Sequence, residues 1–231
     1  GGLWPHVKSA RFSQDDRHVV TASRDGTARI WDTSSGSMTH VLRHGTATGR
    51  PTATVKSASF SQDGRRVVTA SSDGAARIWD TSLGSMTHEL RHSGGWVWSA
   101  RFSQDGRSVV TGGDDGTARI WNASSGEMTQ SHSHGWQIIM SARLSPDGRR
   151  VVSCGEERAV IGFADIRRGS LHVWDASNGE TTWSLGDGRL LQEARFSQDG
   201  LRVTTYDQHG SAYIWDVKTG QRLWPKTLPI E

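Results

Sequence analysis

The chain has 231 residues, of which 34% are hydrophobic and 27 are glycine, a composition that fits strand-rich structure better than disorder. The formal net charge is +3, because 27 basic residues are nearly balanced by 24 acidic ones. Contact with nucleic acid is therefore possible but not favoured. The sequence has no signal peptide and no apolar run of transmembrane length. Its single cysteine, Cys154, excludes an internal disulfide and fits a reducing compartment, so we expect an intracellular, cytoplasmic protein.

The first 44 residues predict four short strands separated by turns. The β-branched run Val19-Val20-Thr21 is typical of a buried strand, and Asp25-Gly26 favours a tight reversal of the chain. Strands are expected at residues 7–13, 18–23, 27–31 and 38–42. The unit is thus a four-stranded antiparallel meander of roughly 40 residues.

The same unit occurs five times. Each copy has a Trp near the end of its third strand, followed by Asp or Asn: Trp31-Asp32, Trp79-Asp80, Trp121-Asn122, Trp174-Asp175 and Trp215-Asp216. One such sheet cannot bury both of its faces alone, so neighbouring copies should stack. A period of about 40 to 45 residues that ends in Trp-Asp is typical of propeller blades.

On these repeats, the chain resembles the WD40 repeat family over roughly residues 6 to 224. The resemblance implies an all-β fold, a WD40-type β-propeller with five four-stranded antiparallel blades, in a single domain or partial propeller. The blades are expected at about residues 6–44, 55–92, 96–134, 138–186 and 190–228. WD40 rings most often have seven blades, which leaves three arrangements open: a closed ring of five, part of a larger ring, or an arc completed by another chain. Gly1 in place of an initiator Met favours the second and third.

The resemblance also implies a buried hydrogen-bond network in each blade. WD40 proteins commonly join the repeated Trp to a hydroxyl, a turn Asp and an upstream His. The matching residues are His92, Thr111, Asp115 and Trp121 in blade three, and His44, Thr69 or Ser71, Asp73 and Trp79 in blade two. Blade one lacks the His, blade five has Gly186 and His209 at the His and Asp positions, and the network is in doubt in blades one, four and five.

No motif predicts catalysis, a metal or a cofactor. His132 and His134 lie on one face of a strand, but no carboxylate or Cys accompanies them at ligand spacing. Cys154 follows a Val-Val strand, where a small buried residue is the simpler interpretation. The sequence has no Gly-x-Ser-x-Gly elbow, and its Gly-rich turn at 112–116 does not open a helix. We therefore expect a protein that is not an enzyme.

Differences between the copies point to one face of the disc. The connections between blades and the second turn within each blade emerge on the same side, and insertions gather there at 45–54, 93–97, 135–138 and 155–169. Trp and Arg are enriched at binding hot spots, so these loops supply the partner-binding candidates. The candidates are Trp96, Trp98, Trp136, Arg50, Glu157, Arg167 and Arg168. The alternatives are local packing of the tryptophans between blades and a solvated hairpin extension at 155–169.

Two classes of function follow. The first is a non-catalytic scaffold that binds a protein or peptide through the loop-bearing face, as a subunit or module of a larger complex. The alternative is an enzyme or small-ligand-binding propeller that uses the axial channel. A nucleic-acid-binding variant would use Arg11, Arg101, Arg143 and Arg195. These arginines share one register, and partnership with the repeated aspartates explains them more simply.

Overall fold

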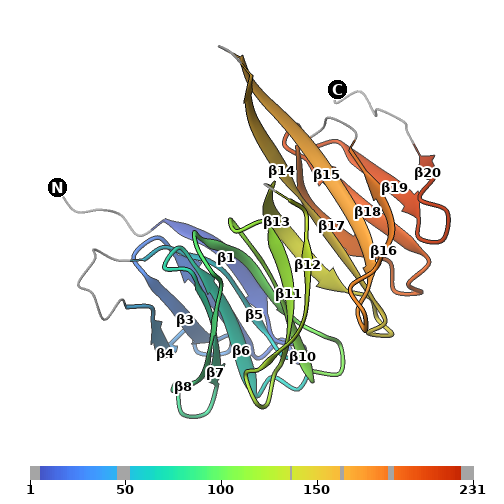
Figure 1. The fold of residues 1–231 in the computed structure, drawn as a ribbon. Helices are drawn as coiled ribbons and strands as arrows, with labels where there is room; N and C mark the ends of the chain where they lie inside the picture. The colour runs from blue at the N-terminus through green and yellow to red at the C-terminus, as the bar shows by residue number, and fades with distance from the viewer. Residues whose placement is uncertain (1–5, 46–52, 136, 162–163, 187–189, 225–231) are drawn as a thin grey trace, which may run out of the picture.

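A computed structural model describes the chain except for residues 1–5, 46–52, 136, 162–163, 187–189 and 225–231 (Figure 1). The side chains of 137 and 157–168 are also outside the description. Arg50 and Trp136 therefore lie outside the described residues, as do the side chains of Glu157, Arg167 and Arg168. Within the described part, no helix is long and apolar enough to cross a membrane.

Twenty strands form five separate four-stranded sheets, each in simple meander order. Blade one comprises β1 (Val7–Phe12), β2 (His18–Ser23), β3 (Thr27–Asp32) and β4 (Met38–Arg43). Blade two comprises β5 (Val55–Phe60), β6 (Arg66–Ser71), β7 (Ala75–Asp80) and β8 (Met86–Arg91). Blade three comprises β9 (Val97–Phe102), β10 (Ser108–Gly113), β11 (Thr117–Asn122) and β12 (Met128–Ser133).

Blade four comprises β13 (Gln137–Leu144), β14 (Arg150–Ile161), β15 (Ala164–Asp175) and β16 (Thr181–Leu185). Blade five comprises β17 (Leu191–Phe196), β18 (Arg202–Asp207), β19 (Ala212–Asp216) and β20 (Arg222–Trp224). All strand pairs are antiparallel, and the repeated Trp lies in the third strand of every blade. The predicted all-β fold and its five blades are confirmed.

The uniform turns follow from side chains that bond to their own backbone. In blade two, the Asp63 carboxylate accepts a hydrogen bond from the Ser61 hydroxyl at 2.6 Å and another from the Arg65 N–H at 3.1 Å. Gly64 completes the turn at φ +69°, where an L side chain would be strained. The same Ser and Asp geometry recurs at the first turn of every other blade. Local sequence alone therefore determines this reversal.

Apolar faces of successive blades pack against each other. The second and third strands alternate side chains between two faces, so Val20 and Ile30 of blade one point toward blade two, where they meet Val67 and Trp79. Equivalent clusters join blades two and three, three and four, and four and five. The blades consequently follow one another in an arc, with blade one at one end and blade five at the other (Figure 1).

The two end blades each have an uncovered face. Phe12 of β1 is 64% exposed, whereas the equivalent residues of the later blades are partly buried in the interblade clusters. Trp31 is likewise less buried than its four equivalents. Among the described residues, no hydrophobic cluster joins blade five to blade one. How the ring is completed, by these two blades or by another part of an assembly, therefore stays a prediction.

The insertion in blade four is a projecting hairpin. Strands β14 and β15 have 12 residues each and remain paired from Arg150↔Asp175 out to Ile161↔Ala164. The pair extends well beyond the neighbouring blades (Figure 1). The segment 155–169 is thus a paired hairpin extension, and its part in partner binding stays a prediction.

Candidate functional site

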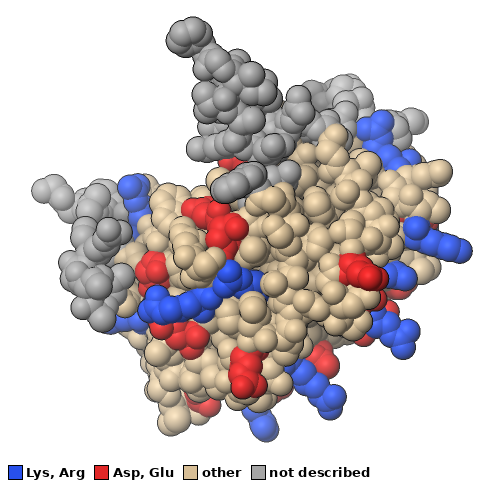
Figure 2. Space-filling model, in the orientation of Figure 1, with Lys and Arg blue, Asp and Glu red and all other residues tan. Residues whose placement is uncertain are grey.

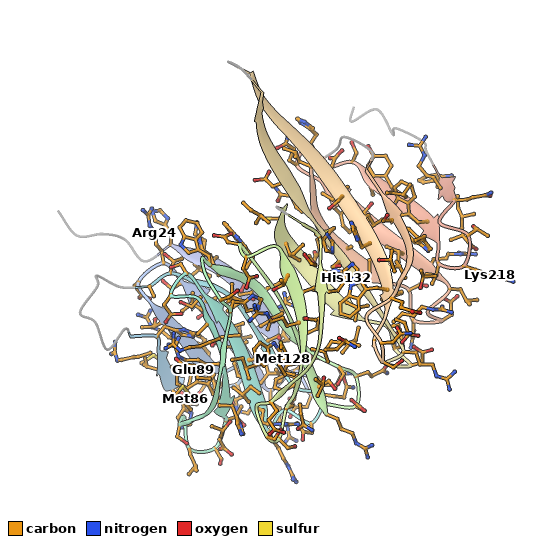
Figure 3. All side chains as sticks on the ribbon, in the orientation of Figure 1. Arg24, Met86, Glu89, Met128, His132 and Lys218 are labelled. Carbon is orange, nitrogen blue, oxygen red and sulfur yellow. The ribbon has the colours of Figure 1, made fainter. Side chains whose placement is uncertain are left out.

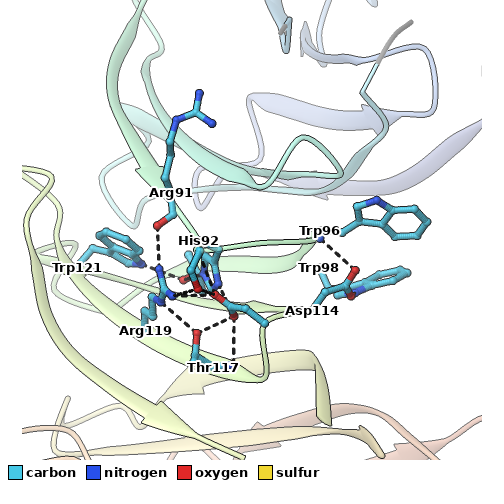
Figure 4. A network of polar contacts seen from close by, with 11 residues as sticks. Arg91, His92, Trp96, Trp98, Asp114, Thr117, Arg119 and Trp121 are labelled. Carbon is cyan, nitrogen blue, oxygen red and sulfur yellow. Dashed lines mark hydrogen bonds and ion pairs between the residues drawn. The ribbon is translucent and has the colours of Figure 1, made fainter. Parts of the chain in front are cut away.

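Blade three contains a complete four-residue network (Figure 4). The indole N–H of Trp121 donates to the Thr111 hydroxyl at 2.9 Å, and the same hydroxyl lies 2.8 Å from His92 Nε2. His92 Nδ1 lies 3.0 Å from the Asp115 carboxylate, which also receives a bond from Arg119 at 2.7 Å. Burial acts to raise the pKa of Asp115, but hydrogen bonds from His92 and Thr117 outweigh it, and the pKa falls. The network links the connection before β9, the strands β10 and β11, and the turn between them.

Blade two has the same arrangement, with Thr69 rather than Ser71 as its hydroxyl. Trp79 donates to the Thr69 hydroxyl at 2.8 Å, and His44 Nε2 lies 2.6 Å from it. Arg77 bonds both to His44 and, at 2.6 Å, to the carboxylate of Asp73. His44 Nδ1 is 3.7 Å from that carboxylate, so the guanidinium is the closer partner of Asp73 here.

The other blades keep only part of this network. In blade one, Trp31 bonds to Thr21 at 3.0 Å, and in blade five Trp215 bonds to Thr205 at 3.0 Å, without a His in either. Blade four keeps more than its sequence suggested. There, Trp174 donates to Ser153 at 3.0 Å and His134 Nε2 lies 2.7 Å from the same hydroxyl.

The Asp or Asn after each Trp has a separate task. Asp32 accepts bonds from the backbone N–H groups of Ser34 and Ser35 at 3.0 and 2.8 Å. The same oxygen accepts the Ser34 hydroxyl at 2.6 Å, and these bonds hold the pKa of Asp32 well below its usual range. The equivalent residues of the other blades accept the same backbone bonds: Asp80, Asn122, Asp175 and Asp216. This position therefore caps the third turn instead of joining the buried network.

Three histidines gather where blades three and four meet, and Figure 3 labels one of them, His132. His172 of β15 joins His132 and His134, and the nitrogens of the three lie within 4.8 Å of one another. His132 Nε2 lies 3.2 Å from His172 Nδ1, while His132 Nδ1 bonds to the Gly179 carbonyl at 3.0 Å. Sequence reasoning missed His172, because this contact crosses from blade three to blade four, between residues 40 positions apart in the chain.

This cluster has the ligand number of a catalytic zinc site but not its geometry. Both ring nitrogens of His134 already have hydroxyl neighbours, Ser153 at 2.7 Å and Ser170 at 3.3 Å. The His134 and His172 rings stack with centroids 3.7 Å apart and planes at 24°, so their in-plane lone pairs do not converge. Burial lowers the pKa of His134 to about 2 and that of His172 to about 4, with neighbouring histidines adding to the shift. The arrangement is that of neutral rings packed between blades.

The remaining candidate groups are Cys154 and the inner-strand arginines. Cys154 is fully buried, and burial raises the pKa of its thiol far above the usual range. A thiol in that state is a poor nucleophile. The inner-strand arginines, in contrast, do not pair with the repeated aspartates as we expected. Arg11, Arg143 and Arg195 instead converge on Glu193, whose carboxylate lies within 3.9 Å of each.

Trp96 and Trp98 lie on the loop-bearing side of blade three (Figure 4). Trp96 is 43% exposed, and its ring centroid is 5.2 Å from that of Trp98. The Asp114 carboxylate accepts the Trp96 backbone N–H at 3.1 Å and the Trp98 indole N–H. From blade two, Lys56 Nζ lies 3.9 Å from the Trp96 ring centroid and 4.4 Å from that of Trp98.

This aromatic pair is a pre-ordered contact surface. The Trp96 ring is held by its contacts with Lys56 and Trp98, and its backbone by the bond to Asp114, so a partner would meet a ring that is already ordered. Trp98 is the more buried of the two and serves chiefly as its support. Lys56 and Asp114 were not among our candidates. Asp114 differs from its counterparts Arg24 and Ser72, and that departure was the available signal, whereas Lys56 recurs as Lys8 in blade one.

Charge does not mark a nucleic-acid surface. On the face in Figure 2, Lys and Arg side chains lie among Asp and Glu rather than in one continuous patch. The other expected partner contacts, Arg50, Trp136, Glu157, Arg167 and Arg168, fall outside the described side chains. Of the predicted site, the structure therefore places Trp96 and Trp98 together and leaves the rest as predictions.

Comparison with known proteins agrees with the fold. The family model described as WD domain, G-beta repeat matches residues 3–32, 39–80, 84–122 and 126–175. A 41-residue stretch is 49% identical to nuclear distribution protein nudF of Emericella nidulans, and it covers 17% of this chain. The match spans only 9% of that relative's length. Because the family model covers more than half of the residues, the chain belongs to the WD40 repeat family.

Proposed function

We propose that this protein is a non-catalytic interaction scaffold that binds a protein or peptide through its loop-bearing face. The observation that carries the proposal is Trp96: a large aromatic ring, 43% exposed, packed on Lys56 and held at its backbone N–H by Asp114. Exposed aromatic residues on a rigid support are the anchors that interfaces use most often. The role as a subunit or module of a larger complex is part of this proposal, as is a cytoplasmic location.

Family membership supports the same class of function, since WD40 domains generally bind protein partners. The chemistry of the described residues agrees. The repeated Trp, Thr and His side chains form buried hydrogen-bond networks, and the only cysteine is buried, which raises the pKa of its thiol. We therefore expect the purified chain to bind without turning over a substrate.

The test compares two exposed side chains on opposite faces of the disc. Trp96→Ala removes the proposed anchor, and Leu83→Ala removes an apolar side chain that is 73% exposed at the third turn of blade two, on the other face. The chain and both variants are used as bait, and the captured proteins are quantified. We expect Trp96→Ala to lose partners that Leu83→Ala retains, with both melting temperatures near the parent because exposed side chains contribute little to stability. If Leu83→Ala alone loses these partners, the interface lies on the face opposite the loop-bearing one, which contradicts the proposal.

A further inference from the structure

The inner strands bring four guanidinium groups to the axis of the arc. Arg11 of β1, Arg101 of β9 and Arg143 of β13 occupy the same strand register, and so does Arg195 of β17. Blade two has Ser59 at this register. The arginines are close enough to oppose one another's charge, and burial and the charges of Arg143 and Arg11 lower the pKa of Arg101 well below its usual range.

One carboxylate, Glu193, offsets these charges. It lies 3.9 Å from Arg11 and 2.9 Å from Arg195, and it also bonds to Arg143. Burial acts to raise the pKa of Glu193, but the hydrogen bond from Arg195 and the charge of Arg143 outweigh it and lower the pKa to about 2. Glu193 is therefore ionised, and this single carboxylate faces the guanidinium groups of several arginines, so basic groups outnumber acidic ones in the cluster.

Donors of this cluster remain unused. The Nε atoms of Arg11, Arg101 and Arg143 are buried without a hydrogen-bond partner among the described residues, and the hydroxyls of Ser9 and Ser57 on the same inner strands share this state. Buried donors of this kind are costly unless something accepts from them. Their concentration at the axis is thus an argument for an acceptor there.

The cluster opens into a cavity of about 430 Å³ that reaches the turn-bearing face, which is the face of the disc with the first turn of each blade, opposite the loop-bearing face. Arg101, Arg143 and Arg195 line it, with Phe60, Phe102 and Phe196 as an apolar wall. Arg101 also lines a second cavity of about 330 Å³, which has Lys56 and Trp98 at the loop-bearing side. Arg101 therefore stands between the two ends of the channel, and a ligand that enters from the turn-bearing face meets three guanidinium groups.

We propose that this axial cluster binds a phosphate group. The planar guanidinium fork matches the oxygens of phosphate. Three guanidinium groups around one cavity carry more positive charge than one negative charge would balance. A doubly charged oxyanion in this cavity would accept from the guanidinium groups of Arg101, Arg143 and Arg195 and reduce the excess of positive charge at the same time. The site is separate from the aromatic surface at Trp96, so it stands whether or not that surface binds a protein.

Isothermal titration calorimetry at pH 8 and constant low ionic strength tests the proposal, with inorganic phosphate, a phosphoserine peptide and acetate as probes. We expect saturable binding of phosphate and much weaker binding of acetate. Tighter binding of the peptide than of inorganic phosphate would identify a phosphorylated partner as the source, and equal binding a free phosphate compound. No saturable binding of either phosphate probe, or equal binding of acetate, would overturn the proposal.

The chain offers its own matched variants. Arg101→Ser introduces the residue that blade two has at this register, and it should weaken phosphate binding about tenfold or more through loss of a charge-assisted bond. Glu193→Gln should tighten binding, because it removes the competing carboxylate. Arg107→Ser removes an exposed arginine of the first turn of blade three that is not among the residues lining the cavity, and it should leave binding unchanged. If Arg101→Ser does not fold, Arg195→Ser, whose side chain is 47% exposed, serves in its place. Equal weakening by Arg107→Ser would show mere surface attraction and refute a specific site.

Discussion

Replacing Trp79 by Ala tests how blades stabilise one another. Trp79 is 5% exposed, donates to Thr69 at 2.8 Å and lies in the cluster shared by blades one and two. Loss of a buried Trp side chain costs about 3–5 kcal/mol of the free energy of unfolding. Trp31 provides a matched control, since it has the same register and the same bond, to Thr21 at 3.0 Å, but in the described part of the chain it lies in no cluster between blades and is less buried.

For Trp31→Ala we expect a loss of about 2 kcal/mol, because only part of the ring is removed from water. The assay is urea denaturation followed by far-UV circular dichroism, with hydrogen exchange to locate the loss in the array. Trp79→Phe, which keeps an aromatic ring but removes the indole N–H, should fall between parent and Trp79→Ala. Equal losses of stability for Trp79→Ala and Trp31→Ala would refute the claim that packing against blade one and the nearby His44 make Trp79 the more stabilising residue.

Three further predictions concern pH, backbone packing and reactivity. In the folded protein the pKa is about 2 for His134 and about 4 for His172, below the usual 6.5. Their contribution to the free energy of unfolding is therefore fully present above pH 6.5 and decreases as the pH falls toward 4, by about 1.4 kcal/mol per group and pH unit. Melts from pH 7.5 to 4.5 should show this decline, with a shallower slope in His132→Leu; a flat profile would contradict it. Gly155→Ala should unfold blade four, since a Cβ would meet the Ile138 carbonyl oxygen at 1.9 Å, whereas Gly45→Ala meets nothing within 4 Å, and melting temperatures compare the two. Cys154 should react with a thiol reagent only after denaturation, and rapid labelling of the native chain would show that it is not buried.

The fold could be predicted because its determinants are local and repeated. The Ser-Gln-Asp-Gly turns form through bonds within a few residues, as Ser61 and Asp63 show. The Trp-Asp pairs fixed the third strands in the same way. Repetition supplied the remaining evidence, since stacking is the only way in which five such sheets can bury both faces.

The site could be predicted only in part, because its contacts cross between blades. Trp96 was recognisable as an aromatic side chain peculiar to one loop. Its supports, Lys56 and Asp114, come from a different blade and a different turn, and no spacing in the sequence brings them together. The meeting of His172 with His132 and the convergence of three arginines on Glu193 have the same origin.

Photo-crosslinking at the position of Trp96 tests the interaction account most directly. A photoreactive phenylalanine analogue is placed at position 96 in one chain and at the exposed position of Leu83 in another, and each is irradiated with the captured partner. The account predicts a covalent partner adduct from position 96 and none from position 83. An adduct from position 83 alone would contradict the assignment of the loop-bearing face.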